Sequence, residues 1–258
     1  MSVITLLTDF GLADWFVGTM KGVILSVNPR ARIVDITHDI APGDIRAAAF
    51  ALAASSRFFP SGTVHVVVVD PGVGSSRKAI AVRTANYFFV GPDNGVLSWA
   101  LWAEKVKAIH LIENEDYMLR AVSHTFHGRD LFAPVAGHIA RGLTLDKLGR
   151  STKDLIRLPW PTRNRRGRRV QGEIIYIDRF GNAITNIEND AVAKAQERSC
   201  EVRVGARRYK CTLKMFYQAA PKHAPIAIPG SCGLLEIAVN GGSAEKLLGL
   251  KVGTRVML

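Results

Sequence analysis

The sequence has few cysteines and no long apolar run. Its three cysteines, Cys200, Cys211 and Cys232, are odd in number and lack Cys-x-x-Cys spacing, so neither a disulfide framework nor a zinc site is predicted. No apolar stretch approaches the ~20 residues that span a bilayer. The N-terminus lacks the basic start and the small-residue cleavage site of a signal peptide. We therefore expect a cytoplasmic protein with no membrane partner.

Acidic residues are outnumbered by basic ones. Lys and Arg number 34 against 22 Asp and Glu, which gives a net charge of +12. Part of this charge is concentrated in W-P-T-R-N-R-R-G-R-R-V, which contains Arg163, Arg165, Arg166, Arg168 and Arg169. Such a run can bind phosphates, but no aromatic residues interleave it and no nucleic-acid module surrounds it. We expect an arginine-rich linker over residues 161–169 rather than a nucleic-acid site.

The most informative segment is H-V-V-V-V-D-P-G-V-G-S-S-R, residues 65–77. A strand that is apolar at every position, rather than at alternate ones, is covered on both faces, as in a parallel sheet between helices. Asp70 would then lie just beyond the carboxyl end of that strand. Open α/β folds bind their ligands at this edge of the sheet.

Two earlier segments repeat this pattern of a strand that ends in a carboxylate. The first ends in Asp9, and the second carries Asp35, His38 and Asp39 near its end. Alternation of strands and helices predicts an α/β domain over residues 1–160 with a doubly wound, Rossmann-like sheet. Asp9 and Asp70 can then converge on one crevice. The expected strands are 2–9, 32–39, 65–70 and 106–111 with a hairpin over 78–90, and the expected helices are 18–27, 44–59, 96–102 and 130–142.

Beyond the arginine-rich segment the pattern changes to short strands separated by turns. This pattern is typical of an all-β domain, and we expect a smaller one over residues 170–258. The expected strands are 172–178, 183–187, 201–204, 208–213, 233–239 and 255–258.

The segment H-T-F-H-G-R-D, residues 124–130, gathers several groups that can carry chemistry just before a helix. His124 and His127 are three residues apart and could ligate a metal with Asp70 or Asp130 as a third ligand. Alternatively, Asp130 starts the helix and one histidine packs structurally. A third possibility is a metal-free cluster of Asp70, Arg77 and His127 that holds and polarises a water. The residue pattern alone leaves these alternatives open.

Two further motifs have both a functional and an ordinary interpretation. Asp178 and Asn182 flank a turn between two expected strands and suit a ligand with an amine and a heteroaromatic edge, although both residues are common in turns. Gly72 to Ser76 resembles a dinucleotide fingerprint but lacks its third glycine, and it lacks the lysine of a P-loop.

Several motifs occur in a fixed order along the whole chain. They are T-D-F-G, V-G-T-M-K-G-V-I, V-D-I-T-H-D-I, F-P-S-G-T-V, V-V-D-P-G-V-G, G-P-D-N-G, F-H-G-R-D-L-F-A-P, I-D-R-F-G-N-A-I-T-N-I and L-E-I-A-V-N-G-G-S-A. In this order the chain resembles the S-adenosylmethionine hydroxide adenosyltransferases, which are adenosine-forming hydrolases related to fluorinating and chlorinating enzymes that use the same substrate.

The resemblance implies a reaction, an assembly and a set of site residues. The reaction is attack of activated water on the ribose C5′ of S-adenosylmethionine, which releases adenosine and methionine without a cofactor. The assembly is a homotrimer with active sites between subunits. The catalytic positions fall on Asp70, Arg77 and His127. The substrate positions fall on Asp9 for the ribose, Asp178 and Ser231 for the methionine end, Asn182 for adenine, and Glu236 and Val239 in the C-terminal nucleoside-binding segment.

The chain also departs from its halide-using relatives. They carry tyrosine where this chain has Asp70 and serine where it has Gly128, so a halide would lose a hydrogen-bond donor and meet a carboxylate. Water is therefore the expected nucleophile. Cys232 stands where those relatives have an arginine for the methionine carboxylate. A metal-dependent hydrolase using His124, His127 and Asp70, or a non-catalytic nucleoside-binding module, are the rival hypotheses.

Overall fold

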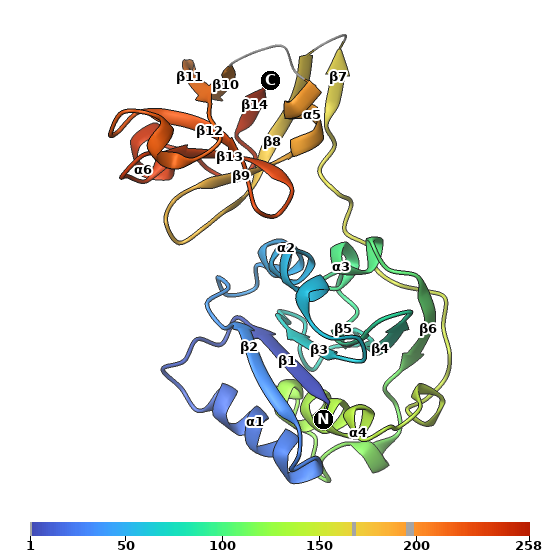
Figure 1. Cartoon of the computed structure of the whole chain (residues 1–258). Coiled ribbons are helices and arrows are strands. Elements are labelled where there is room, and N and C mark those ends of the chain that lie inside the picture. Colours follow the sequence, from blue (N-terminus) through green and yellow to red (C-terminus); the bar gives the residue numbers. More distant parts are fainter. Residues whose placement is uncertain (1, 167–168, 195–198) are drawn as a thin grey trace. The chain divides into compact units, whose positions relative to one another are not determined.

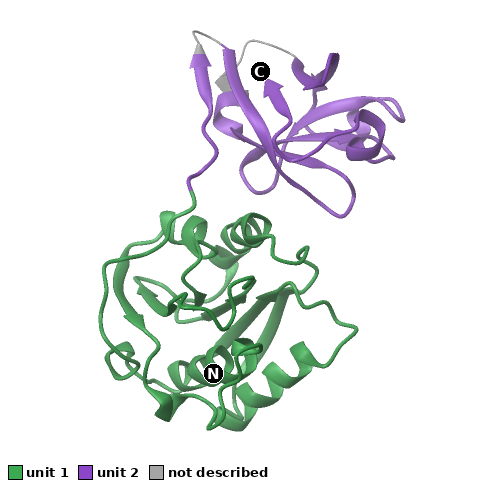
Figure 2. Cartoon of the chain, turned by 180° about the vertical axis from the view of Figure 1, so that it is seen from behind, with its two compact units in different colours: residues 1–158 green, residues 159–258 purple. Residues whose placement is uncertain are grey.

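The chain forms two compact units, residues 1–158 and 159–258 (Figure 2). The structure is a computed structural model that describes residues 2–166, 169–194 and 199–258 (Figure 1). The first unit contains a sheet with helices, and the second is mostly β structure.

The first unit is built on a six-stranded sheet with the order β2-β1-β3-β5-β4-β6. Its strands are β1 (Val3–Thr8), β2 (Arg32–Thr37), β3 (Val64–Val68), β4 (Ala79–Thr84), β5 (Phe88–Pro92) and β6 (Val106–Leu111). β2, β1, β3 and β5 pair in parallel, whereas β4 is antiparallel to both β5 and β6. The expected hairpin over 78–90 is therefore confirmed, and it makes the sheet mixed rather than wholly parallel.

Helices cover both faces of this sheet, as the unbroken valine run predicted. Val64, Val66 and Val68 of β3 belong to one core together with α1 (Phe16–Val27) and α4 (Ala133–Ala140). Val67 and Val69 belong to a second core together with α2 (Ile45–Ser55) and α3 (Ser98–Trp102). Successive side chains of a strand point to opposite faces, so every valine is buried.

The helices begin and end close to the expected positions. Asp44 caps α2 by accepting a hydrogen bond from the Ala47 amide, as an N-cap residue does. The helix expected from Asp130 has a different start. A wide π-helical turn over Gly128–Phe132 comes first, and regular helix follows in α4. Such turns are frequent at functional sites.

The second unit is a closed barrel of seven strands. The ring is β8 (Arg169–Ile177), β9 (Ala183–Glu188), β13 (Leu234–Val239), β12 (Pro225–Pro229), β11 (Arg207–Leu213), β10 (Ser199–Val204) and β14 (Arg255–Met257). β14 pairs with both β10 and β8 and so closes the ring. A barrel has no open edge strands within the ring, which removes sites of unwanted pairing.

Several elements of this unit differ from those expected. β12 was not expected, because it has a proline at each end and prolines are uncommon inside strands. Two short helices, α5 (Asn189–Lys194) and α6 (Ala244–Leu248), interrupt the all-β pattern. The stretch 161–169 contains a further strand, β7 (Asn164–Arg166), which pairs with β8. Arg168 in this stretch lies outside the described residues. Within the described ranges, no helix has the length and apolar character needed to cross a bilayer.

Candidate active site

A cavity of about 520 Å³ lies at the carboxyl ends of β1 and β3. Between β1 and β2 the chain passes through α1 on one face of the sheet, and between β2 and β3 it passes through α2 on the other face. The two connections diverge at the boundary between β1 and β3, where an open α/β sheet leaves a crevice for a ligand. Asp9, Asp70 and His127 all line this cavity. The expectation that Asp9 and Asp70 share one crevice is confirmed.

Asp9 directly follows β1 and has a fixed orientation. Its Oδ2 accepts a hydrogen bond of 2.8 Å from the Gly43 amide. Gly43 has φ of 73°, in the left-handed region that favours glycine, and it lies in the turn before α2. One backbone amide occupies Oδ2, so acceptor capacity remains on both carboxylate oxygens for a ligand.

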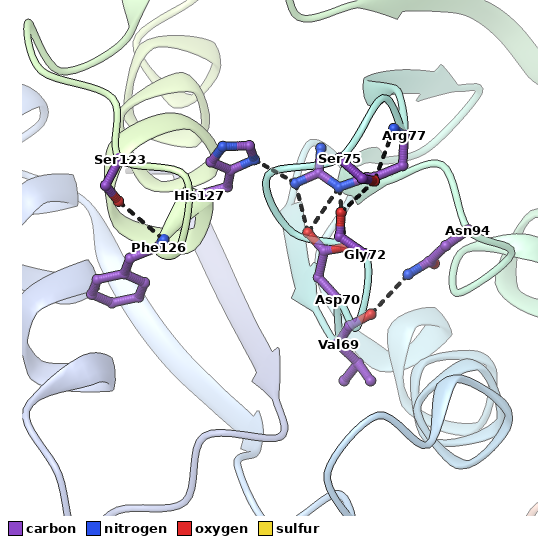
Figure 3. Close-up of polar contacts among 9 residues, drawn as sticks. All are labelled: Val69, Asp70, Gly72, Ser75, Arg77, Asn94, Ser123, Phe126 and His127. Carbon is purple, nitrogen blue, oxygen red and sulfur yellow. Dashed lines mark hydrogen bonds and ion pairs between the residues drawn. The ribbon is translucent and has the colours of Figure 1, made fainter.

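Arg77 joins Asp70 and His127 into one cluster (Figure 3). Its Nε lies 3.0 and 2.9 Å from the two carboxylate oxygens of Asp70, and its Nη2 lies 2.6 Å from Asp70 Oδ2. The same Nη2 lies 2.6 Å from His127 Nδ1. The side chains of Asp70 and Arg77 are 4% and 11% exposed. A charge-assisted pair that is this well shielded from solvent holds its geometry tightly.

The contact with Arg77 fixes the tautomer of His127. A guanidinium only donates hydrogen bonds, so His127 Nδ1 accepts and the ring proton of the neutral imidazole is on Nε2. Burial, together with the positive charge of Arg77, lowers the pKa of His127 below its ordinary value of 6.5. His127 is therefore neutral at pH 7 and presents an N–H donor on the side of the ring away from Arg77.

The backbone around the cluster is held by a second set of polar side chains (Figure 3). Asn94 donates from Nδ2 to the Val69 carbonyl at 2.9 Å, directly before Asp70. Ser75 donates to the Gly72 carbonyl and accepts from the Arg77 amide. Asn94 of the G-P-D-N-G motif therefore holds the backbone that carries Asp70.

The loop before His127 is fixed in a similar way. Ser123 Oγ accepts from the Phe126 amide at 3.1 Å. Fully buried Asp130 accepts from the Ser123 amide and forms an ion pair with Arg129. Asp130 thus supports the loop rather than lining the cavity.

The metal hypothesis finds no ligand set. Within the described ranges, no three His, Cys, Asp or Glu side chains are grouped as metal ligands. Asp70, His124 and His127 are all among the described residues. The Nδ1 of His127 and both oxygens of Asp70 are bonded to Arg77 instead.

Aromatic rings form the apolar wall of the cavity. Phe10, Phe16 and Phe126 line it and contact one another, with ring centroids 5.0 to 5.8 Å apart. Gly128 lies beside them. These phenylalanines were missed as cavity residues, although Phe10 directly follows Asp9 and Phe126 directly precedes His127 in the sequence.

The second unit contains the remaining predicted residues. Asp178 and Asn182 lie in the turn between β8 and β9 and bond to each other. Asp178 Oδ1 accepts from the Asn182 amide at 2.9 Å, and Oδ2 accepts from Asn182 Nδ2 at 3.0 Å. The turn is therefore preorganised, and the Asn182 side-chain carbonyl is left to accept a further donor.

Glu236 on β13 forms a hydrogen bond that the sequence did not suggest. The Tyr217 hydroxyl donates to Glu236 Oε1 at 2.6 Å. Burial raises the pKa of Glu236 above its ordinary value, and the nearby charge of Asp178 acts in the same direction, against the hydrogen bond from Tyr217. Ser231 is exposed in the turn before β13, whereas the Val239 side chain packs into the barrel core.

Comparison with known proteins gives matches over nearly the whole chain. Residues 4–149 match the N-terminal domain model of the SAM hydroxide adenosyltransferases, and residues 172–257 match the C-terminal domain model. An (R)-S-adenosyl-L-methionine hydrolase of Thermus thermophilus is 39% identical, with 100% of both chains covered. A fluorinase of Actinoplanes sp. is 26% identical over 98% of this chain and 96% of its own.

A solved structure has the same fold. The crystal structure of a conserved protein from Thermotoga maritima superposes with a TM-score of 0.93 at 39% identity, with 98% of each chain covered. The domain matches, the full-length relatives and this structure agree with the resemblance of the ordered motifs. The chain belongs to the SAM hydroxide adenosyltransferase family.

Proposed function

We propose that this protein hydrolyses S-adenosylmethionine to adenosine and methionine. The observation that carries the proposal is the Asp70–Arg77–His127 cluster at the mouth of β1 and β3, in a chain 36–39% identical to four proteins named (R)-S-adenosyl-L-methionine hydrolase. By the same similarity, the substrate is the R epimer at sulfur. The metal-dependent and non-catalytic alternatives are not favoured.

The leaving group needs little help from the protein. The oxygen of water forms a bond to C5′ while the bond from C5′ to sulfur breaks, and its electron pair stays on sulfur. The sulfonium becomes a neutral thioether, so no general acid is required. The enzyme must instead place a water in line with the C5′–S bond and remove its proton.

The cluster supplies both requirements. Asp70 accepts a hydrogen bond from the attacking water and takes its proton. Free water, with a pKa of about 15.7, is a poor proton donor to a carboxylate. Once its oxygen bonds to carbon it becomes an oxonium, a much stronger acid than a carboxylic acid. Arg77 orients Asp70, and neutral His127 holds the water through Nε2–H.

Substrate binding is divided between the units. Asp9 accepts hydrogen bonds from the ribose hydroxyls, and Phe10, Phe16 and Phe126 cover the apolar surface of the bound nucleoside. Asp178 and Ser231 bind the methionine end of the substrate, and Asn182 binds adenine. Glu236 and the backbone at Val239 line the nucleoside site. We propose a homotrimer in which the first unit of one subunit and the second unit of a neighbour share each site, in agreement with the split of polar groups over two units.

The finer points of architecture and location belong to the same proposal. The β1-α1-β2-α2-β3 order supports a Rossmann-like domain over residues 1–160, joined by residues 161–169 to a β domain over 170–258. Cys200 and Cys211 face each other on neighbouring strands as buried thiols, which fits a reducing, cytoplasmic location.

The purified protein should convert S-adenosylmethionine to adenosine and methionine, and in oxygen-18 water the label should enter the 5′-hydroxyl of adenosine. Mass spectrometry of the product measures the label. The reaction should persist after exhaustive treatment with a chelator. Unlabelled adenosine, or activity restored only by a divalent ion, would reject the mechanism.

As the pH is lowered, the activity should be lost with a midpoint below 6.5, because the pKa of His127 is lowered from that value. The neutral imidazole accepts from Arg77. Protonation of His127 on Nδ1 would place two N–H donors face to face, one from the imidazole and one from Arg77, and would break this hydrogen bond. A profile of kcat/KM against pH measures this, with His127→Gln as the control that lacks the titration. An acid limb centred above 6.5 in the wild type would contradict the assignment.

If the three cluster residues act as a unit, His127→Ala should slow the chemical step by about 10²-fold, because the attacking water loses the N–H donor that holds it in line. The double variant with Arg77→Ala should lose far less than the product of the two single losses. Single-turnover kinetics measures the chemical step, and calorimetry with adenosine checks that binding is kept. Multiplicative losses, or a defect confined to binding, would be evidence for separate roles.

A shared site predicts complementation between inactive variants. Light scattering should give a trimer, and mixing Asp70→Ala subunits with Asn182→Ala subunits after mild dissociation should restore part of the activity. Some interfaces would then combine an intact first unit with an intact second unit. An active monomer, or no recovery in confirmed mixed trimers, would exclude sites between subunits.

A further inference from the structure

A chain of polar side chains runs from the surface to the turn that carries Asp9. Lys21 Nζ lies 2.6 Å from Asp35 Oδ2, and the other oxygen of Asp35 lies 3.1 Å from His38 Nε2. On the far side of its ring, His38 Nδ1 lies 2.8 Å from Thr8 Oγ1. Thr8 and His38 are buried, and Asp35 is partly exposed. Neither Thr8 nor His38 has a role in the mechanism above.

The direction of each hydrogen bond follows from the groups involved. His38 Nε2 lies close to the Asp35 carboxylate without the alignment of a hydrogen bond, and the negative charge of that carboxylate favours the tautomer of His38 with its proton on Nε2. His38 Nδ1 then accepts from the Thr8 hydroxyl. The Thr8 oxygen keeps lone pairs, and it accepts from the Phe10 amide at 3.2 Å.

His38 also holds the same turn through its backbone. Its carbonyl accepts a hydrogen bond of 2.8 Å from the Gly11 amide. The pairing of β2 with β1 shifts register between Leu6 and Leu7, just before Thr8. Irregularities of this kind are over-represented beside active sites, where they re-aim side chains. The amides on the C-terminal side of Asp9, at Phe10 and Gly11, are thus both bonded to the Thr8–His38 pair.

We propose that Thr8 and His38 are positioning residues. By accepting hydrogen bonds from the Phe10 and Gly11 amides, they fix the Asp9 carboxylate and the Phe10 ring in the cavity. The inference rests on the proposed function and extends it to residues outside the cavity. Asp9 is held from two sides, by Gly43 on its carboxylate and by this pair on the backbone that follows it. Displacement of the ribose by about 1 Å costs up to 10²-fold in rate, because attack on C5′ requires alignment with sulfur.

The chain offers a matched control on the same strand. Thr5 Oγ1 lies 2.7 Å from His65 Nδ1, with both residues buried, as in the Thr8–His38 pair. Thr5 lies three residues earlier on β1, and neither it nor His65 lines the cavity. His65 packs among aromatic rings instead, stacked on Phe89 and edge-on to Phe59 and Tyr87.

The test compares Thr8→Val with Thr5→Val. Each change removes one buried hydroxyl with little change in volume, so both should lower the melting temperature. Only Thr8→Val should also lower kcat/KM, by about 10–100-fold, and weaken adenosine binding in calorimetry. Thr8→Ser, which keeps the hydroxyl, should restore both. Asp9→Ala serves as the reference for loss of the ribose contact.

The outcomes separate the inference from the proposed function. If the wild type does not cleave S-adenosylmethionine, the proposed function fails, whereas adenosine affinity still reports on the turn. If the wild type is active but Thr8→Val and Thr5→Val behave alike, the pair is merely structural and the inference is overturned. If Thr8→Val does not fold, the variant Asp35→Ala tests the inference instead, because Asp35 is the partly exposed residue that contacts His38. It should weaken adenosine binding, and unchanged affinity and kcat/KM would overturn the inference.

Discussion

The parallel pairing of β1 with β3 is the constraint on which the site depends. Thr5 pairs with His65 and Thr8 with Val68, so both strands end at the same edge. Asp9 follows one strand directly, and Asp70 follows the other after one more residue. The apolar side chains of both strands are buried on both faces, so a slip in register would move them to the wrong core. The separation of the two carboxylates is thereby set by two strands whose side chains are almost all buried.

Arg77 solves the electrostatic problem that this pairing creates. Two acidic side chains in one cavity repel each other, and a buried carboxylate such as that of Asp70 is costly to desolvate. The guanidinium neutralises Asp70 and also bonds His127, which comes from a segment far along the chain. One side chain therefore sets the charge of the cluster and the tautomer of the imidazole. Lysine could not replace it, because a single ammonium lacks the planar fork that contacts both partners.

Residue patterns were sufficient to predict the sheet unit and the convergence of Asp9 and Asp70, because an unbroken apolar run followed by a carboxylate has few structural interpretations. They could not separate metal binding from a metal-free cluster at His127. That distinction depends on which partner occupies Nδ1, and Arg77 lies fifty residues away in the sequence. β12 was missed since its prolines are typical of loops. Tyr217 was missed since nothing local links it to Glu236, which lies on another part of the barrel.

The choice of nucleophile depends on the wall of the cavity as well as on the cluster. A side-chain carbon at position 128 would lie 3.1 Å from Met20 Sδ, 3.2 Å from the Phe126 ring and 3.3 Å from the Phe10 ring. These contacts are tight, so a serine at this position, which the motif resemblance implies for the halide-using enzymes, would require the rings to move. Phe10 is also the residue whose amide bonds to Thr8. We therefore expect conversion of this site to halide use to need more than replacement of Asp70 and Gly128, because the added side-chain carbon would press on the Phe10 ring, next to Asp9.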